Sequence, residues 1–258
     1  YIPDGIGNST DRQRIPAVLI IPGGAFRRLV YNFEGEDVAK WLNSMGIAAF
    51  VVECRLPSDE HDNAEDVPLI DAMRAMRVIR GRAQEFGIDE AKIGVMGFSA
   101  GGFMAALLST AYESDVYADY KYKDEYDKLS ARPDFAVCSY PVISIDDCIE
   151  AGKRYMSEEQ VLERISDSKA KILHKYNPDK LVRPDMPPVF ICETDDDRTT
   201  LSENSVGFYM AARKAGVSAE LHIFRTGGHG YGCGDDFAQT GEWKVLFTKW
   251  IKSIGIIS

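Results

Sequence analysis

The chain has 258 residues, of which 45% are hydrophobic and 27% are charged, as in a single large α/β domain. Its formal net charge of −10 argues against nucleic acid as a partner, because an acidic protein repels phosphate backbones. No run approaches the ~18 apolar residues of a membrane-spanning helix. No signal peptide is recognisable. The first residue is Tyr1 rather than Met, so this observation leaves the compartment open. We therefore expect a soluble protein that is either cytoplasmic or exported after removal of an N-terminal segment.

Short apolar runs rich in Val, Ile and Phe predict six strands, and apolar residues at steps of three and four predict five helices. The clearest helix, Asp66–Phe86, is expected to stop at Gly87. The predicted strands are Ala17–Ile21, Ile47–Glu53, Ile93–Gly97, Phe135–Tyr140, Val189–Cys192 and Glu220–Phe224, and the other helices are Glu36–Ser44, Ala100–Tyr112, Ser202–Ala215 and Gly241–Ile254.

This alternation predicts one α/β domain, residues 1–258, with a mostly parallel central sheet covered by helices on both faces. Two polar stretches, Glu113–Arg132 and Gly152–Tyr176, interrupt the pattern. Each is expected to be either a lid over the carboxyl ends of the strands or plain surface decoration. The cysteines form no CxxC pair and suggest buried thiols rather than disulfides. They are Cys54, Cys138, Cys148, Cys192 and Cys233.

A G-x-S-x-G motif follows one predicted strand and begins the next predicted helix. The motif is Gly97-Phe98-Ser99-Ala100-Gly101. A serine in such a tight turn is lifted clear of the sheet, and the flanking glycines avoid side-chain collisions. Ser99 is therefore the predicted nucleophile.

The first predicted strand runs into Pro22-Gly23-Gly24-Ala25-Phe26. Paired glycines suit a loop whose N–H groups must face a ligand. In this kind of site one oxyanion donor comes from such a loop and another from the residue after the serine. Gly24, Ala25 and Ala100 are the predicted oxyanion donors.

His229 lies in a glycine-rich loop between the last predicted strand and the last predicted helix, which is where the base belongs when the chain order is Ser, acid, His. His61, His174 and His222 fit less well and are expected to be structural, with His61 at best a substrate contact.

The acid should follow the strand Val189–Cys192, where Asp195, Asp196 and Asp197 stand in a row. Consecutive residues cannot all turn toward one metal ion, so a metal site is not expected. The residues themselves leave the choice of aspartate open.

Taken together, these motifs resemble the compact α/β-hydrolase esterases related to bacterial acetyl xylan esterases and to the catalytic domain of prolyl oligopeptidases. In that family the acid is an aspartate followed by two residues, then Val-Pro, with Glu-Asn-Ser shortly after. Counting back from Glu203-Asn204-Ser205 selects Asp197, with Asp195 as the alternative, although Thr200-Leu201 replaces Val-Pro. Further motifs that carry the resemblance are Glu34-Gly35-Glu36, Arg55-Leu56, Arg132-Pro133-Asp134-Phe135, Tyr140-Pro141-Val142-Ile143-Ser144 and Gly228-His229-Gly230.

The resemblance implies a serine carboxylesterase that removes short acyl groups, with acetyl expected, from a carbohydrate such as xylan or xylo-oligosaccharides. Its mechanism requires no cofactor or metal. The alternatives are a serine peptidase of the prolyl-oligopeptidase type and a non-catalytic binding protein on a hydrolase fold. The sequence leaves acyl length, sugar identity and oligomeric state open.

Overall fold

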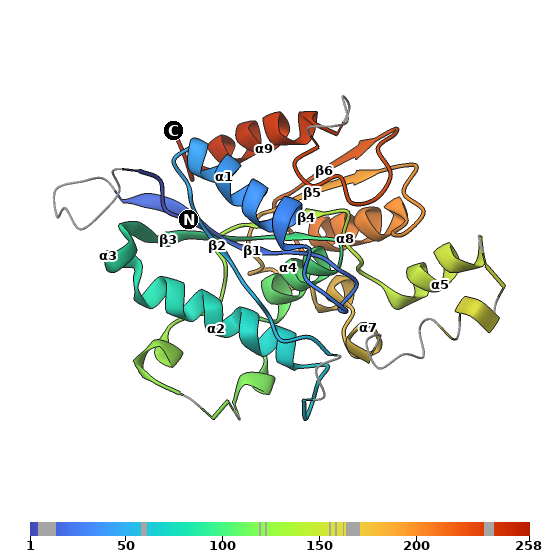
Figure 1. Cartoon of the computed structure of the whole chain (residues 1–258), viewed down its shortest axis with the longest axis horizontal. Helices are drawn as coiled ribbons and strands as arrows, with labels where there is room; N and C mark the ends of the chain where they lie inside the picture. The colour runs from blue at the N-terminus through green and yellow to red at the C-terminus, as the bar shows by residue number, and fades with distance from the viewer. Residues whose placement is uncertain are drawn as a thin grey trace.

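A six-stranded parallel sheet in the order β2-β1-β3-β4-β5-β6 forms the centre of the molecule (Figure 1). The computed structural model of the chain describes residues 1–4, 14–57, 61–118, 120–121, 123–154, 156–157, 159–161, 163, 171–234 and 240–258. The strands are β1 Ile15–Ile21, β2 Ala48–Val51, β3 Ile88–Phe98, β4 Ala136–Ser139, β5 Val189–Thr194 and β6 Ala219–Phe224.

Helices cover both faces of this sheet, as predicted. Alternate residues of β1 enter opposite cores: Leu19 and Ile21 face α2, α4 and α8, whereas Val18 and Ile20 face α1 and α9. Such double burial explains the nearly continuous apolar runs in the sequence. The helices are α1 Asp37–Ser44, α2 Val67–Gly81, α3 Ala83–Phe86, α4 Ala100–Ala111, α5 Ile145–Lys153, α7 Lys171–Lys175, α8 Ser202–Lys214 and α9 Glu242–Ser253.

The predicted helix Asp66–Phe86 was wrong in one respect, because the chain forms two helices there. The backbone leaves the helical region at Arg82 (φ −101°, ψ 17°). The break turns Phe86 against Phe50 of β2, with ring centroids 4.9 Å apart. Gly87 ends α3 with φ +69°, as predicted.

β3 begins earlier than predicted, at Ile88 rather than Ile93. Ile88 pairs with Ile15, and the register shifts before Ile93 pairs with Ala17. This irregularity accommodates the polar residues Asp89, Glu90 and Lys92, which interrupt the apolar pattern at the start of the strand.

The two polar stretches occupy different places. The described part of 113–132 lies against α2, on the side away from the sheet (Figure 1). Arg74 binds Asp124 and Asp127 of this segment, and Arg80 donates to the carbonyl of Arg132 at 3.0 Å. This segment is a cover for α2.

The second stretch, 152–176, begins in the last turn of α5, a helix that starts beyond the carboxyl end of β4. In its described part, Arg154 pairs with Glu203 of α8 at 3.2 Å, and Lys175 pairs with Asp66 at 2.6 Å. It therefore lies at the end of the sheet where substrates enter such folds. The lid role remains a prediction.

Cys54, Cys138, Cys192 and Cys233 are buried free thiols, in keeping with the expectation from the sequence. Burial raises the pKa of Cys54 and of Cys192 to about 12 each. The side chain of Cys148 lies outside the described residues. Among the described helices, none combines the length and the apolar character needed to span a bilayer.

Candidate active site

Ser99 stands between β3 and α4 with strained backbone angles, φ +53° and ψ −118°. The turn is tight enough to require its glycines. A Cβ at Gly97 would lie 1.9 Å from the carbonyl oxygen of Gly101, and a Cβ at Gly101 would lie 1.9 Å from that of Ile21. The local structure is thus the strained strand–turn–helix that the motif predicts, a conformation that persists where the surroundings enforce it.

The structure brings His229 to Ser99 across 130 residues of chain. His229 Nε2 lies 2.9 Å from Ser99 Oγ, and His229 Nδ1 lies 2.6 Å from Asp197 Oδ2. Gly228 and Gly230 on either side have φ values of +63° and +78°, so the loop bends sharply around the imidazole. Serine, histidine and aspartate form one continuous hydrogen-bonded chain.

Asp197 is the aspartate that reaches the histidine, and it is only 3% exposed. Its Oδ1 accepts the N–H groups of Thr199 at 2.7 Å and Thr200 at 3.0 Å, and its Oδ2 accepts the Thr200 hydroxyl at 3.0 Å. Burial acts to raise the pKa of Asp197, but the bond and charge of His229 and these N–H donors outweigh it and lower the pKa. Asp197 is therefore held in its charged form.

The two neighbouring aspartates, Asp195 and Asp196, bond to other parts of the chain. Asp196 Oδ1 accepts the N–H groups of Gly227 at 2.9 Å and Gly228 at 2.8 Å, which ties the histidine loop to the end of β5. Asp195 is exposed, and its backbone N–H bonds to the Phe224 carbonyl at 2.8 Å. The alternative acid, Asp195, thus makes no bond to His229.

The loop after β1 carries the predicted oxyanion donors. Gly24, Ala25 and Phe26 have φ values of +132°, +56° and +57°, so consecutive residues turn into a left-handed arrangement that can direct N–H groups to one side. A Cβ at Gly24 would lie 2.1 Å from the Arg28 carbonyl oxygen, so only glycine fits there. Ala100 begins α4, where the helix leaves its N–H without an intrahelical acceptor.

Three residues near this site were not predicted from the sequence: Thr200, Glu34 and Tyr140. The Thr200 hydroxyl lies 3.3 Å from His229 Nδ1 in addition to its bond with Asp197. Glu34, 3% exposed, accepts the phenol hydroxyl of Tyr140 at 2.9 Å. Glu34 and Tyr140 both stand in motifs that carried the family resemblance, which was the available signal.

The other histidines lie away from Ser99 and Asp197. His222, in β6, bonds Glu220 at 2.7 Å and packs on the ring of Phe190. His174 lies on α7, and His61 lies in the turn before α2. Within the residues that the structure describes, no group of three His, Cys, Asp or Glu side chains could hold a metal ion.

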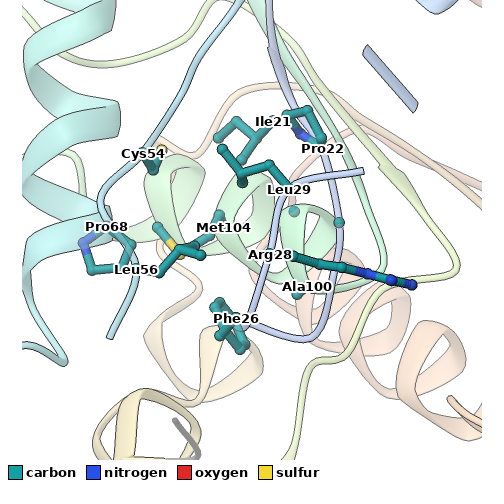
Figure 2. Close-up of a pocket in the computed structure, with 12 residues that line it drawn as sticks. Ile21, Pro22, Phe26, Arg28, Leu29, Cys54, Leu56, Pro68, Ala100 and Met104 are labelled. Atoms are coloured by element: carbon teal, nitrogen blue, oxygen red, sulfur yellow. The ribbon is translucent and has the colours of Figure 1, made fainter. Parts of the chain in front are cut away.

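An apolar pocket adjoins Ser99, and its space of about 280 Å³ includes part of the open solvent (Figure 2). Gly23 and Ala100 line it, and a Cβ at Gly23 would lie 3.0 Å from Ser99 Cβ. Arg28, the charged residue of the lining, is exposed and extends away from the apolar side chains in Figure 2. The remaining lining residues are Ile21, Pro22, Phe26, Leu29, Cys54, Leu56, Pro68, Gly101 and Met104.

Comparison with known proteins places this geometry in context. The BD-FAE family model matches residues 6–211. An acetylxylan esterase of Xylanibacter ruminicola is 31% identical over 240 residues, which are 92% of this chain and 45% of that protein. The chain therefore spans less than half the length of this curated relative.

Two solved structures align along the whole chain. The acetyl ester-xyloside bifunctional hydrolase of Caldicellulosiruptor lactoaceticus is 37% identical, with a TM-score of 0.81 and coverage of 100% of this chain and 88% of the other. A propionate-bound esterase of Thermogutta terrifontis is 25% identical, with a TM-score of 0.76 and coverage of 100% and 89%. The predicted α/β-hydrolase fold and the family resemblance are confirmed.

Proposed function

The chain belongs to the BD-FAE family, and we propose from this premise that it is a serine esterase that removes short acyl groups, acetyl above all, from a carbohydrate. The observation that carries the proposal is the chain of bonds from Asp197 through His229 to Ser99, at 2.6 Å and 2.9 Å. A serine in such an arrangement is an activated nucleophile. The acetylxylan esterase relative supports the carbohydrate part.

The first half-reaction forms an acyl-enzyme. Ser99 Oγ attacks the ester carbonyl carbon while His229 Nε2 takes the hydroxyl proton, and Asp197 stabilises the resulting imidazolium. The oxygen that becomes negative is bound by the N–H groups of Gly24, Ala25 and Ala100. The bond from carbon to the alcohol oxygen then breaks, and His229 gives its proton to the departing sugar hydroxyl.

The second half-reaction frees the enzyme. His229 takes a proton from a water molecule, whose oxygen attacks the acyl carbon at the position that the alcohol has left. The tetrahedral intermediate collapses, Ser99 recovers its proton from His229, and the carboxylic acid is released. This chemistry uses only groups that the chain itself supplies.

The pocket beside Ser99 favours the acyl part of the substrate over the sugar. Its lining is apolar apart from Arg28 at the edge, whereas a sugar needs polar partners for its hydroxyl groups. A short acyl chain fits such a space, and the propionate-bound relative is consistent with one.

The test uses a series of 4-nitrophenyl esters from acetate to octanoate, together with acetylated xylan and acetylated xylo-oligosaccharides. We expect the highest kcat/KM with acetate to butyrate, a fall with longer chains, and release of acetate from the saccharides. The Ser99→Ala variant gives the background rate. Cleavage of small esters without acetate release from either saccharide would contradict the carbohydrate assignment.

A further inference from the structure

Glu34 carries a buried carboxylate that neither half-reaction uses. It lies in the short π-helical segment Asn32–Glu36, which follows the oxyanion loop and leads into α1. Its two oxygens each accept one hydrogen bond: Oε2 accepts the N–H of Gly23 at 2.8 Å, and Oε1 accepts the hydroxyl of Tyr140 at 2.9 Å. Burial raises the pKa of Glu34, against the effect of these two donors and of the charge on His229. Such burial is costly unless the acceptors are satisfied.

The bond to Gly23 fixes the oxyanion loop. A Cβ at Gly23 would lie 2.7 Å from Glu34 Oε2 and 3.0 Å from Ser99 Cβ, so the carboxylate, the loop and the nucleophile are in direct packing contact. The Gly23 N–H is therefore bound to Glu34. The next two N–H groups of the loop, those of Gly24 and Ala25, directly follow this fixed point in the chain.

The bond to Tyr140 extends the anchor to the histidine loop. Tyr140 Oη accepts the N–H of Gly232 at 3.0 Å, and the Tyr140 ring packs against the ring of His229 with centroids 5.0 Å apart. Tyr140 has a φ of +38°, which is rare for a residue other than glycine. Such a backbone conformation persists only where the surroundings enforce it. The carboxylate, the phenol and the Gly232 amide thus form one chain between the loops after β1 and β6.

We propose that Glu34 is a positioning residue that, with Tyr140, sets the distance between the oxyanion loop and the His229 loop on the two sides of Ser99. The inference rests on the proposed function. A carboxylate suits this role because it offers two acceptors and no donor. The Gly23 N–H and the Tyr140 hydroxyl both require an acceptor at this place.

The experiment measures kcat and KM for 4-nitrophenyl acetate in Glu34→Ala, Glu34→Gln, Tyr140→Phe and the double variant Glu34→Ala/Tyr140→Phe. Titration with a fluorophosphonate gives the concentration of reactive serine, so that kcat is expressed per active site. Glu36→Ala is the matched control, because Glu36 is in the same π-helical segment and pairs with Lys40 at the surface, at 2.8 Å. The melting temperature of each variant reports its folding.

We expect Glu34→Ala to lower kcat per active site about 100-fold, since a displacement of about 1 Å at a catalytic group costs that much, while KM changes less than about 3-fold. Glu34→Gln keeps one acceptor for Gly23 and should restore kcat to within about 10-fold of wild type. The double variant should be no slower than Glu34→Ala, because both side chains act in one chain of bonds. Glu36→Ala should match wild type.

Wild-type kcat per active site in a folded Tyr140→Phe protein, whether or not Glu34→Ala folds, would overturn the inference. So would losses in the double variant that multiply those of the single variants. A wild-type protein without serine-dependent hydrolysis would overturn the proposed function itself, and the inference with it.

Discussion

Thr200 donates its hydroxyl, at 3.0 Å, to the same oxygen of Asp197 that faces His229 Nδ1. The Thr200 side chain is buried, with 1% exposed, and its own N–H binds the other oxygen of Asp197 at 3.0 Å. This residue therefore orients the acid twice, once through the backbone, which any residue provides, and once through the hydroxyl.

Thr200→Val removes the hydrogen bond from the Thr200 hydroxyl to Asp197 and keeps the shape of the side chain. A hydrogen bond to a charged group contributes about 1.5–3 kcal/mol, and the remaining N–H donors retain part of the orientation, so we expect kcat to fall about 10-fold. Steady-state kinetics on 4-nitrophenyl acetate measure this. Thr199→Val is the control, because Thr199 is exposed and binds Asp197 through its backbone N–H. Equal kcat values for the two variants would contradict the role of the hydroxyl.

Asp197→Asn and Asp195→Asn separate the two candidate acids. An asparagine at 197 keeps the size of the side chain but favours the wrong tautomer of His229, so kcat should fall about 10⁴-fold. Asp195 is exposed and has no bond to His229, so Asp195→Asn should stay within about 3-fold of wild type. Measurement of kcat at a saturating ester concentration decides between them, and a larger loss at 195 would refute the assignment.

Glu193 makes the stability of the fold depend on pH. Its carboxyl is fully buried, and burial first, then the nearby charge of Asp197, raises its pKa well above the ordinary value. The folded protein therefore keeps a proton on Glu193 at pH values where the unfolded chain has released it. Stability must fall as pH rises from the ordinary carboxyl pKa toward the raised one.

Glu193→Gln imitates the protonated carboxyl and should remove this dependence. Above about pH 5 we expect the free energy of unfolding to fall more steeply with pH in wild type than in Glu193→Gln. Urea unfolding at a series of pH values measures both slopes. The pKa of Glu34 is also raised. Its contribution to the slope is the same in both proteins and cancels when the two slopes are compared. The exposed residue Glu150 provides a control, Glu150→Gln. Parallel slopes for wild type and Glu193→Gln would rule out a protonated Glu193.

Leu56 offers a way to change the size of the apolar pocket. It lines the pocket opposite Ala100 in a loop and is only partly buried, so substitution there disturbs the core little. Leu56→Trp should fill the pocket and lower the ratio of kcat/KM for butyrate to that for acetate about 10-fold, whereas Leu56→Ala should raise it. An unchanged ratio in both variants would mean that the acyl chain binds elsewhere.

The sequence predicted those features that local pattern determines. Each of the six strands was found from its apolar run, and the Ser99 turn was found because glycines at 97 and 101 leave few other conformations possible. Boundaries failed where polar residues lie inside an element, as at residues 89–92 of β3, or where tertiary packing bends a regular pattern, as at Arg82.

The supporting residues of the site could not be predicted in this way. Glu34 and Tyr140 are 106 residues apart, and nothing in the spacing of either motif indicates that one accepts a bond from the other. The choice of Asp197 over Asp195 likewise came from resemblance, because three adjacent aspartates have no pattern that separates them. Which of the three aspartates turns inward depends on the direction in which the chain leaves β5, and the packing of the sheet sets that direction.

The comparison of wild type with Ser99→Ala tests the central claim most directly. Both proteins are assayed for hydrolysis of 4-nitrophenyl acetate, with melting temperature as the check on folding. We predict a loss of at least about 10⁴-fold in kcat, leaving what the oxyanion site alone supports. A folded Ser99→Ala protein that hydrolyses the ester at the wild-type rate would contradict the account.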